Sequence, residues 1–134
     1  MGLDSSVTLK SKRKLTSEFP AWVSITRNTH ITDHEFPYLY DISYFRKAWA
    51  VHDLMVFLGV PNCDEAEGDY KMLEGYREGL IDFLRNPEDF DDRSQVFTMK
   101  TYMGNIAQSI LNCSWAIKYL KEHPDVVVEF SDSY

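Results

Sequence analysis

The spacing of hydrophobic and polar residues predicts three helices. Residues 43–58 are apolar around nearly the whole helical circumference, which is typical of a helix at the centre of a domain. A second helix is expected over 65–85, because Asp64 and Glu67 form the pattern of a capping box. The third helix is expected over 99–122, where an amphipathic pattern persists without interruption.

The two longer helices each present an apolar arc. In the helix over 65–85 this arc consists of Met72, Leu73, Tyr76, Leu80, Phe83 and Leu84. Gly75 and Gly79 stand at its edge, and each costs about 1 kcal/mol relative to alanine in a helix interior. We therefore expect a neighbouring element to pass close to them. The arc of the third helix consists of Tyr102, Met103, Ile106, Ile110, Cys113, Ile117 and Leu120.

Alternating and β-branched residues predict strands near both ends of the chain. Residues 5–10 and 22–27 are expected strands, residues 28–42 have no clean period and are expected to form a loop, and residues 126–130 form a closing strand. A strand rich in valine would be an exposed edge if it stood alone, so it is expected to pair with an N-terminal strand. The sequence predicts a single α+β domain, three main helices with a small sheet formed by N-terminal and C-terminal strands, over residues 1–134.

Composition restricts the class of protein. The chain has 134 residues, 44% of them hydrophobic and 14% aromatic, which is enough to build a core. Because no apolar run approaches the roughly 18 residues of a membrane span, we expect no membrane partner. The start of the chain has no signal-peptide pattern, and Cys63 and Cys113 are too few for a disulfide framework. A cytoplasmic protein with reduced thiols is expected.

The net charge of −7 is concentrated in one segment. Residues 64–92 contain eleven acidic and three basic residues. Such a segment repels nucleic acid and favours a basic partner, although a solvated face would have the same composition. The acidic residues that follow the predicted second helix surround an aromatic residue and have no evident structural reason. They are the first candidates for a protein-binding site: Glu88, Asp89, Phe90, Asp91 and Asp92.

A second candidate interface lies on the third helix. Trp115 and Tyr119 fall on the side opposite the predicted core arc, among side-chain amides. Large aromatic residues set among amides often mark an interface, so we expect a partner or a second copy, giving a homodimer, to cover them. The competing cover is the N-terminal segment with its own aromatic residues, Phe19, Trp22 and Phe36.

His52 is the candidate for a small-ligand pocket, with Arg46 on the same predicted helix. A histidine on an apolar helix face can be a base or a ligand contact, or a core histidine whose ring nitrogens are satisfied by backbone or hydroxyl groups. His30 and His34 have no complete metal-binding pattern around them, and no phosphate-binding glycine loop or nucleophile motif occurs. The sequence thus favours a binding protein without a cofactor or metal over an enzyme.

Three stretches of the sequence carry a family resemblance: Met-Gly-Leu-Asp at 1–4, Tyr-Phe-Arg-Lys-Ala-Trp-Ala-Val-His at 44–52, and the aromatic-serine ending at 130–134. Together they resemble a family of small, uncharacterised proteins of bacteriophages and prophages. Members of that family continue with Met-Tyr-Leu after the first four residues and carry an aromatic-Arg-Lys-Ala-Asn-x-Ile-His helix. Here Ser-Ser-Val follows the first four residues, and Trp49 stands in place of the asparagine.

The resemblance implies a phage or prophage accessory protein in the cytoplasm of the bacterial host, and it brings no activity with it. Together with the acidic segment and the aromatic face, it leads to the expectation of a protein that binds a host or phage macromolecule, with modulation of host defence as one outcome. The alternative is a small-ligand, nucleotide-like binding protein or an enzyme with its pocket at His52.

Overall fold

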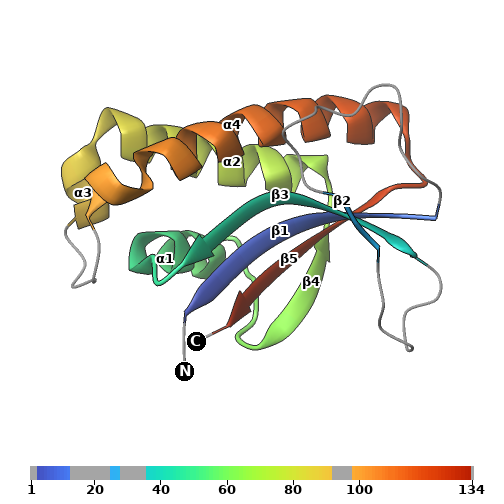
Figure 1. Ribbon diagram of the computed structural model, residues 1–134, viewed down its shortest axis with the longest axis horizontal. Helices are drawn as coiled ribbons and strands as arrows, with labels where there is room; N and C mark the ends of the chain where they lie inside the picture. Colours follow the sequence, from blue (N-terminus) through green and yellow to red (C-terminus); the bar gives the residue numbers. More distant parts are fainter. Residues whose placement is uncertain (1–2, 13–24, 28–35, 92–97, 134) are drawn as a thin grey trace.

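The computed structural model describes residues 3–12, 25–27, 36–91 and 98–133 (Figure 1). In these ranges an antiparallel sheet of five strands is covered by helices, so the fold class is α+β, as predicted. The strands are β1 (Asp4–Ser11), β2 (Ile25–Arg27), β3 (Tyr38–Arg46), β4 (Asp64–Gly68) and β5 (Val127–Ser133), in the spatial order β2-β3-β1-β5-β4. The helices are α1 (Trp49–Phe57), α2 (Tyr70–Arg85), α3 (Pro87–Asp91) and α4 (Met99–Glu122).

The sheet joins the two ends of the chain. β1 lies between β3 and β5, and it pairs with β5 from Asp4 opposite Ser133 to Lys10 opposite Val127. The expected pairing of the N-terminal and C-terminal strands is therefore confirmed. Alternate side chains of both strands are buried beneath the helices: Ser5, Val7, Leu9 and Ser11 on β1, and Val128, Phe130 and Asp132 on β5.

The third strand corrects the sequence prediction. Tyr38–Arg46 forms β3, although residues up to 42 were expected to be a loop and residue 43 to begin a helix. Opposite β1, Ser43 faces Val7 while Asp41 faces Thr8, so one residue of β3 is inserted at a β-bulge. The bulge buries Ile42 and Ser43 in succession and interrupts the period of two. This interruption hides the strand from a search for alternation. Residues 28–35 of the expected loop lie outside the described residues.

The first helix is shorter and more peripheral than expected. α1 begins at Trp49 and buries Ala50, Val51, His52 and Met55. Val56 and Phe57 are 53% and 85% exposed, so the prediction of a central helix was wrong. The stretch 44–52 that carries the family resemblance therefore spans the junction between β3 and α1 instead of lying within one helix.

The start of the second helix also differs from the prediction. Residues 64–68 form β4, paired with β5, and α2 begins at Tyr70. The capping residue is Asp69 rather than Asp64, because the Asp69 side chain accepts a hydrogen bond of 2.9 Å from the backbone N–H of Met72. The acidic residues of β4 are thus charges on a strand at the edge of the described sheet, a common protection of such edges.

The two glycines of α2 lie against α1, which confirms the expected close approach. A Cβ atom at Gly79 would lie 2.5 Å from a methyl carbon of Leu54, and one at Gly75 would lie 3.2 Å from Leu58. The predicted apolar arc of α2 is confirmed at its centre, where Leu73, Tyr76 and Leu80 are fully buried. Leu84 at its end is 37% exposed.

The third predicted helix, α4, has the predicted bounds, and most of its predicted apolar arc is buried, namely Tyr102, Ile106, Cys113 and Ile117. The buried face of the helix is, however, wider than that arc. Met103 is 51% exposed, whereas Ser109, Asn112 and Tyr119 are buried. Part of the polar side of the helix therefore faces the protein as well. The reason lies in β3, whose outer edge pairs with β2 only from Tyr38 to Tyr40 among the described residues.

Side chains of α4 bind the rest of that edge. Asn112 Nδ2 donates to the carbonyl of Ile42 at 3.0 Å, Asn105 Nδ2 to that of Tyr44 at 2.8 Å, and the Tyr102 hydroxyl to that of Arg46 at 2.6 Å. Alternate carbonyls of an antiparallel strand point to the same side, so these three form one row. The helix takes the place that a further strand would otherwise occupy.

Candidate functional site

His52 belongs to a buried polar cluster beneath α1. Its Nδ1 atom lies 2.6 Å from Asp132 Oδ2, and the Ser5 hydroxyl donates to Asp132 Oδ1 at 2.8 Å. Asp132 is completely buried, and His52 is 7% exposed. The ring of Trp49 meets the imidazole edge to face at a centroid distance of 5.4 Å. The cluster joins the first strand, the first helix and the last strand of the chain.

The partner of His52 was missed by the sequence analysis. The predicted last strand stopped at residue 130, but β5 continues to Ser133, and its alternation places Asp132 on the same inner row as Phe130. That period of two was the available signal. The Nδ1 atom of the histidine is bound to a carboxylate, a type of partner that was not predicted beside backbone and hydroxyl groups. A carboxylate at Nδ1 fixes the orientation of an imidazole. Because both side chains are buried, the pair serves to hold α1 against β5 rather than to bind a ligand.

The pocket that Arg46 lines does not include His52. Arg46 lies at the exposed end of β3, where it lines a pocket with Tyr44, Lys47, Thr101, Tyr102 and Asn105. His52 does not line that pocket and is held by Asp132 in the core. The predicted small-ligand site thus divides into a buried histidine and a separate surface pocket that contains the arginine.

The acidic segment has structural explanations that the sequence analysis missed. Phe90 is completely buried and packs edge to face on Phe83 at 5.3 Å and near Tyr102 at 5.4 Å. Asp91 accepts a hydrogen bond of 2.6 Å from the backbone N–H of Met99, at the start of α4. Glu88 and Asp89 lie in the first turn of α3, where negative charge is favourable. Asp92 lies outside the described residues.

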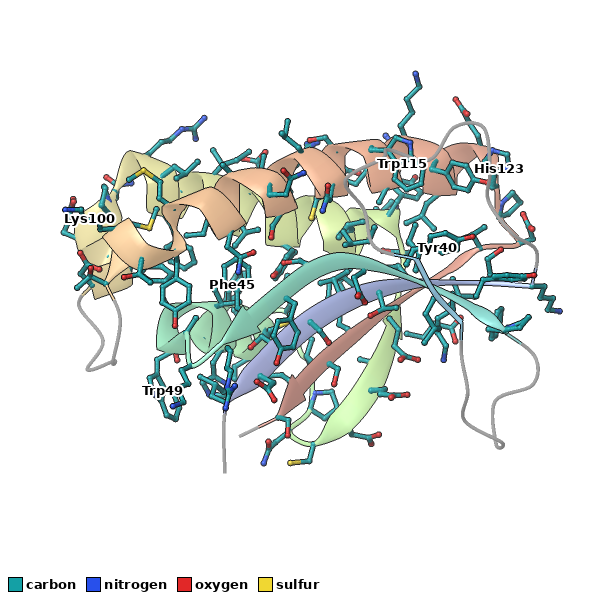
Figure 2. All side chains as sticks on the ribbon, viewed as in Figure 1. Tyr40, Phe45, Trp49, Lys100, Trp115 and His123 are labelled. Atoms are coloured by element: carbon teal, nitrogen blue, oxygen red, sulfur yellow. The ribbon has the colours of Figure 1, made fainter. Side chains whose placement is uncertain are left out.

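A row of stacked rings occupies the C-terminal half of α4. Trp115 stacks on Tyr119 at 5.0 Å, and Tyr119 stacks on His123 at 4.0 Å. Figure 2 shows Trp115 and His123 at the end of the molecule opposite Trp49 and Lys100. Tyr119 is 5% exposed, so the prediction that both aromatic residues stand outside the core was wrong for Tyr119. Trp115 is only partly buried, with Phe19 and Trp22 of the competing cover outside the described residues.

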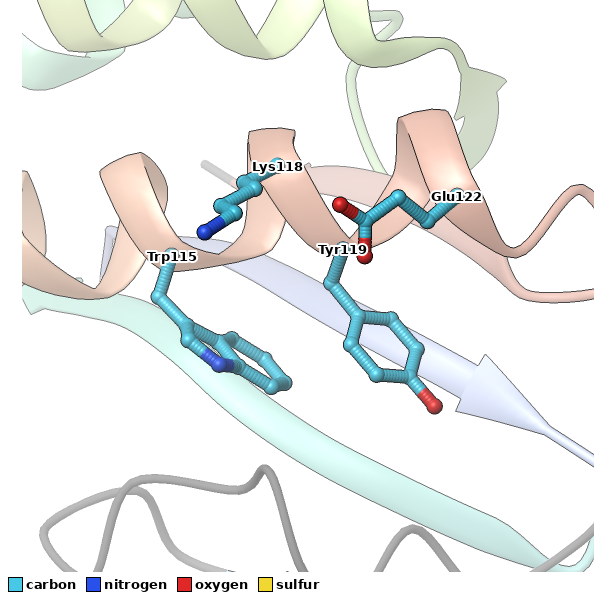
Figure 3. A pocket seen from close by; sticks show the side chains of 4 residues that line it. All are labelled: Trp115, Lys118, Tyr119 and Glu122. Carbon is cyan, nitrogen blue, oxygen red and sulfur yellow. The ribbon is translucent and has the colours of Figure 1, made fainter.

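A pocket of about 320 Å³ lies beside this stack (Figure 3). It is lined by Trp115, Lys118, Tyr119 and Glu122. In Figure 3 the two rings hang from the helix toward the strands, side by side, with the lysine and the glutamate above them. The two rings form the floor of the pocket. Lys118 and Glu122 are exposed and form its rim, which therefore carries one positive and one negative charge.

The described ranges contain neither a metal-binding cluster nor a membrane-spanning helix. No group of three or more His, Cys, Asp or Glu side chains there is arranged to hold a metal ion; His30 and His34 lie outside these ranges. None of the described helices combines the length and apolar character needed to cross a lipid bilayer. Comparison with protein-family models, curated proteins and solved structures finds no match to this chain.

Proposed function

We propose that this protein is a phage or prophage accessory protein that acts by binding a host or phage protein in the bacterial cytoplasm. The resemblance at both ends of the chain and at residues 44–52 supports the phage origin. The pocket beside Trp115 and Tyr119 carries the proposal that binding is its mode of action.

The ring stack has the properties of an interface anchor. Trp115, which is only partly buried, is held against the buried ring of Tyr119 at 5.0 Å, so it loses little side-chain entropy when a partner covers it. Rigid aromatic residues beside a pocket are the residues that dominate protein interfaces. The exposed pair Lys118 and Glu122 supplies a polar rim that can form hydrogen bonds with a partner.

The charge distribution supports a protein partner rather than nucleic acid. The chain carries a net charge of −7, which repels phosphate backbones. On α2 the side chains of Glu74, Glu78 and Asp82 follow one another at spacings of four, and the latter two are exposed. Such a row favours approach of a basic surface.

A pair of variants tests the proposal. Exchanging the rim charges, Lys118→Glu with Glu122→Lys, conserves composition and alters only exposed side chains of the pocket. Leu111→Glu is the matched control, since Leu111 is 56% exposed on the same helix outside the pocket. We expect the charge exchange to reduce capture of a defined partner from host cells about tenfold, which corresponds to about 1.4 kcal/mol, while Leu111→Glu captures it normally. Equal capture by both variants would refute the assignment of the pocket.

A small-ligand function is the second candidate, and Arg46 rather than His52 favours it. Arg46 lines a pocket, whereas His52 is buried against Asp132.

A further inference from the structure

The pocket that contains Arg46 lies between the end of β3 and the first turns of α4. Its volume is about 540 Å³, and its lining consists of Tyr44, Arg46, Lys47, Thr101, Tyr102 and Asn105. Pockets of about 300–1,000 Å³ are typical of small-molecule sites. The site lies near the end of the molecule at which Trp49 and Lys100 are seen in Figure 2, far from Trp115.

The backbone at Lys47 brings two positive charges into this one pocket. Successive side chains of a strand point to opposite faces, which would separate Arg46 from Lys47. Lys47 instead has a φ of +59°, and its backbone N–H donates to the carbonyl of Leu3, so the chain turns where β3 ends. Residues other than glycine rarely adopt this left-handed conformation, and retained strain of this kind clusters at functional sites.

The charge balance of the pocket is positive. Among the described residues neither Arg46 nor Lys47 forms an ion pair with a carboxylate. The carboxylate of Asp4, which faces Arg46 across the β1–β3 pair, accepts a hydrogen bond of 3.0 Å from the Tyr44 hydroxyl. Two cations beside one engaged carboxylate create a local positive field on a chain whose net charge is −7.

The walls of the pocket are fixed by hydrogen bonds. The Tyr102 hydroxyl is bound to the carbonyl of Arg46, and the Asn105 amide is bound to the carbonyl of Tyr44. The ring of Tyr44 is 51% exposed and forms a flat apolar wall. A planar group can stack on such a ring, while a guanidinium beside an ammonium matches the geometry and charge of a phosphate group.

We propose that this pocket binds a phosphate monoester that carries a planar group, of the size and chemistry of a nucleoside monophosphate. Arg46 and Lys47 hold the phosphate, and the Tyr44 ring contacts the planar group. This site deepens the second candidate function and is independent of the Trp115 pocket.

Titration calorimetry on the full chain tests the site with adenosine, guanosine, cytidine and uridine 5′-monophosphates, with adenosine and inorganic phosphate as partial ligands. At least one nucleotide is expected to bind at least about tenfold more tightly than either partial ligand, because it uses both parts of the pocket. Failure of all four nucleotides to bind would overturn the proposal. Phosphate that binds as tightly as the best nucleotide would overturn the role of the Tyr44 wall.

Lys47→Gly is the decisive variant, because glycine adopts the φ of this position without strain. We expect it to lose at least about tenfold in nucleotide affinity, as one phosphate contact is removed, while its melting temperature stays equal or rises. Lys100→Ala, an exposed lysine of α4 outside the pocket lining, is the control and should bind normally. Unchanged affinity in Lys47→Gly would overturn the site. The rim exchange at Lys118 and Glu122 should leave nucleotide binding intact, which separates this proposal from partner binding.

Discussion

Asn112 of α4 donates its Nδ2 hydrogen to the backbone carbonyl of Ile42 on β3 at 3.0 Å, and both residues are buried. The helix is therefore attached to the sheet by a polar contact at a position where an amphipathic helix would place an apolar one. We expect Asn112→Ala to lower the free energy of unfolding by about 1–3 kcal/mol, because the buried carbonyl loses its donor. Urea denaturation measures this change.

The control for that variant is Leu111→Ala, one residue away and 56% exposed, which should change stability by less than about 0.5 kcal/mol. Equal stability of the two variants would show that the carbonyl of Ile42 finds another donor and that α4 is not fixed to the strand edge through its amides.

The pair formed by His52 and Asp132 should be strongly coupled. Removing either partner leaves the other buried without its contact, so His52→Ala and Asp132→Ala are each expected to cost about 3–5 kcal/mol. In the double variant the losses should fall short of their sum by more than about 1 kcal/mol. Additive losses in the double-mutant cycle would contradict the pairing. Ser5→Ala, which removes one neutral donor to Asp132, should cost about 1 kcal/mol.

Two glycines provide opposite expectations for the same substitution. Gly79→Ala should destabilise the protein despite the higher helix propensity of alanine, because its Cβ would lie 2.5 Å from Leu54. Gly104→Ala on α4 meets no atom within 4 Å and should stabilise by up to about 1 kcal/mol. Thermal melts of the two variants should shift in opposite directions. A higher melting temperature in both variants would show that Leu54 does not lie against Gly79 of α2.

The two cysteines should differ in reactivity. Cys63 is exposed, whereas burial raises the pKa of the Cys113 thiol to about 12 from 9.0. A thiol reagent at pH 8 should modify one cysteine in the folded protein and both after denaturation. Modification of both at similar rates under native conditions would contradict the burial of Cys113.

The raised pKa of Cys113 should make the protein less stable at alkaline pH. Above about pH 9 the unfolded chain ionises a thiol that stays protonated in the folded protein. The free energy of unfolding should therefore fall as the pH rises toward 12, by up to about 1.4 kcal/mol per pH unit from this group. The loss between pH 8 and pH 10 should be smaller in Cys113→Ala, measured by urea denaturation at both values.

Elements that are encoded by a local sequence pattern were predicted, and elements whose pattern is interrupted or ambiguous were missed. α4 and the terminal strands have uninterrupted patterns and were predicted, although β5 continues three residues beyond the predicted end at 130. β3 was missed because its bulge breaks alternation, and β4 was missed because its residues resemble a helix start whose true cap is Asp69.

The candidate site was less predictable, because it depends on contacts between distant parts of the chain. Nothing local indicates that Asn112 faces a strand edge 70 residues away or that Asp132 meets a histidine 80 residues away. Lys47 was missed as a ligand candidate because only its left-handed backbone brings it into the same pocket as Arg46. The sequence does not indicate that backbone conformation.

Site-specific photo-crosslinking in bacterial cells tests partner binding at the Trp115 pocket most directly. A photoreactive residue replaces Lys118 on the rim of the pocket, and a second variant carries it at Leu111 on the exposed side of the same helix. We predict a defined adduct with another protein from position 118 and none from position 111. Equal adducts from both positions, no adduct from position 118, or an adduct at only twice the 15.7 kDa mass of the chain would contradict the proposed function.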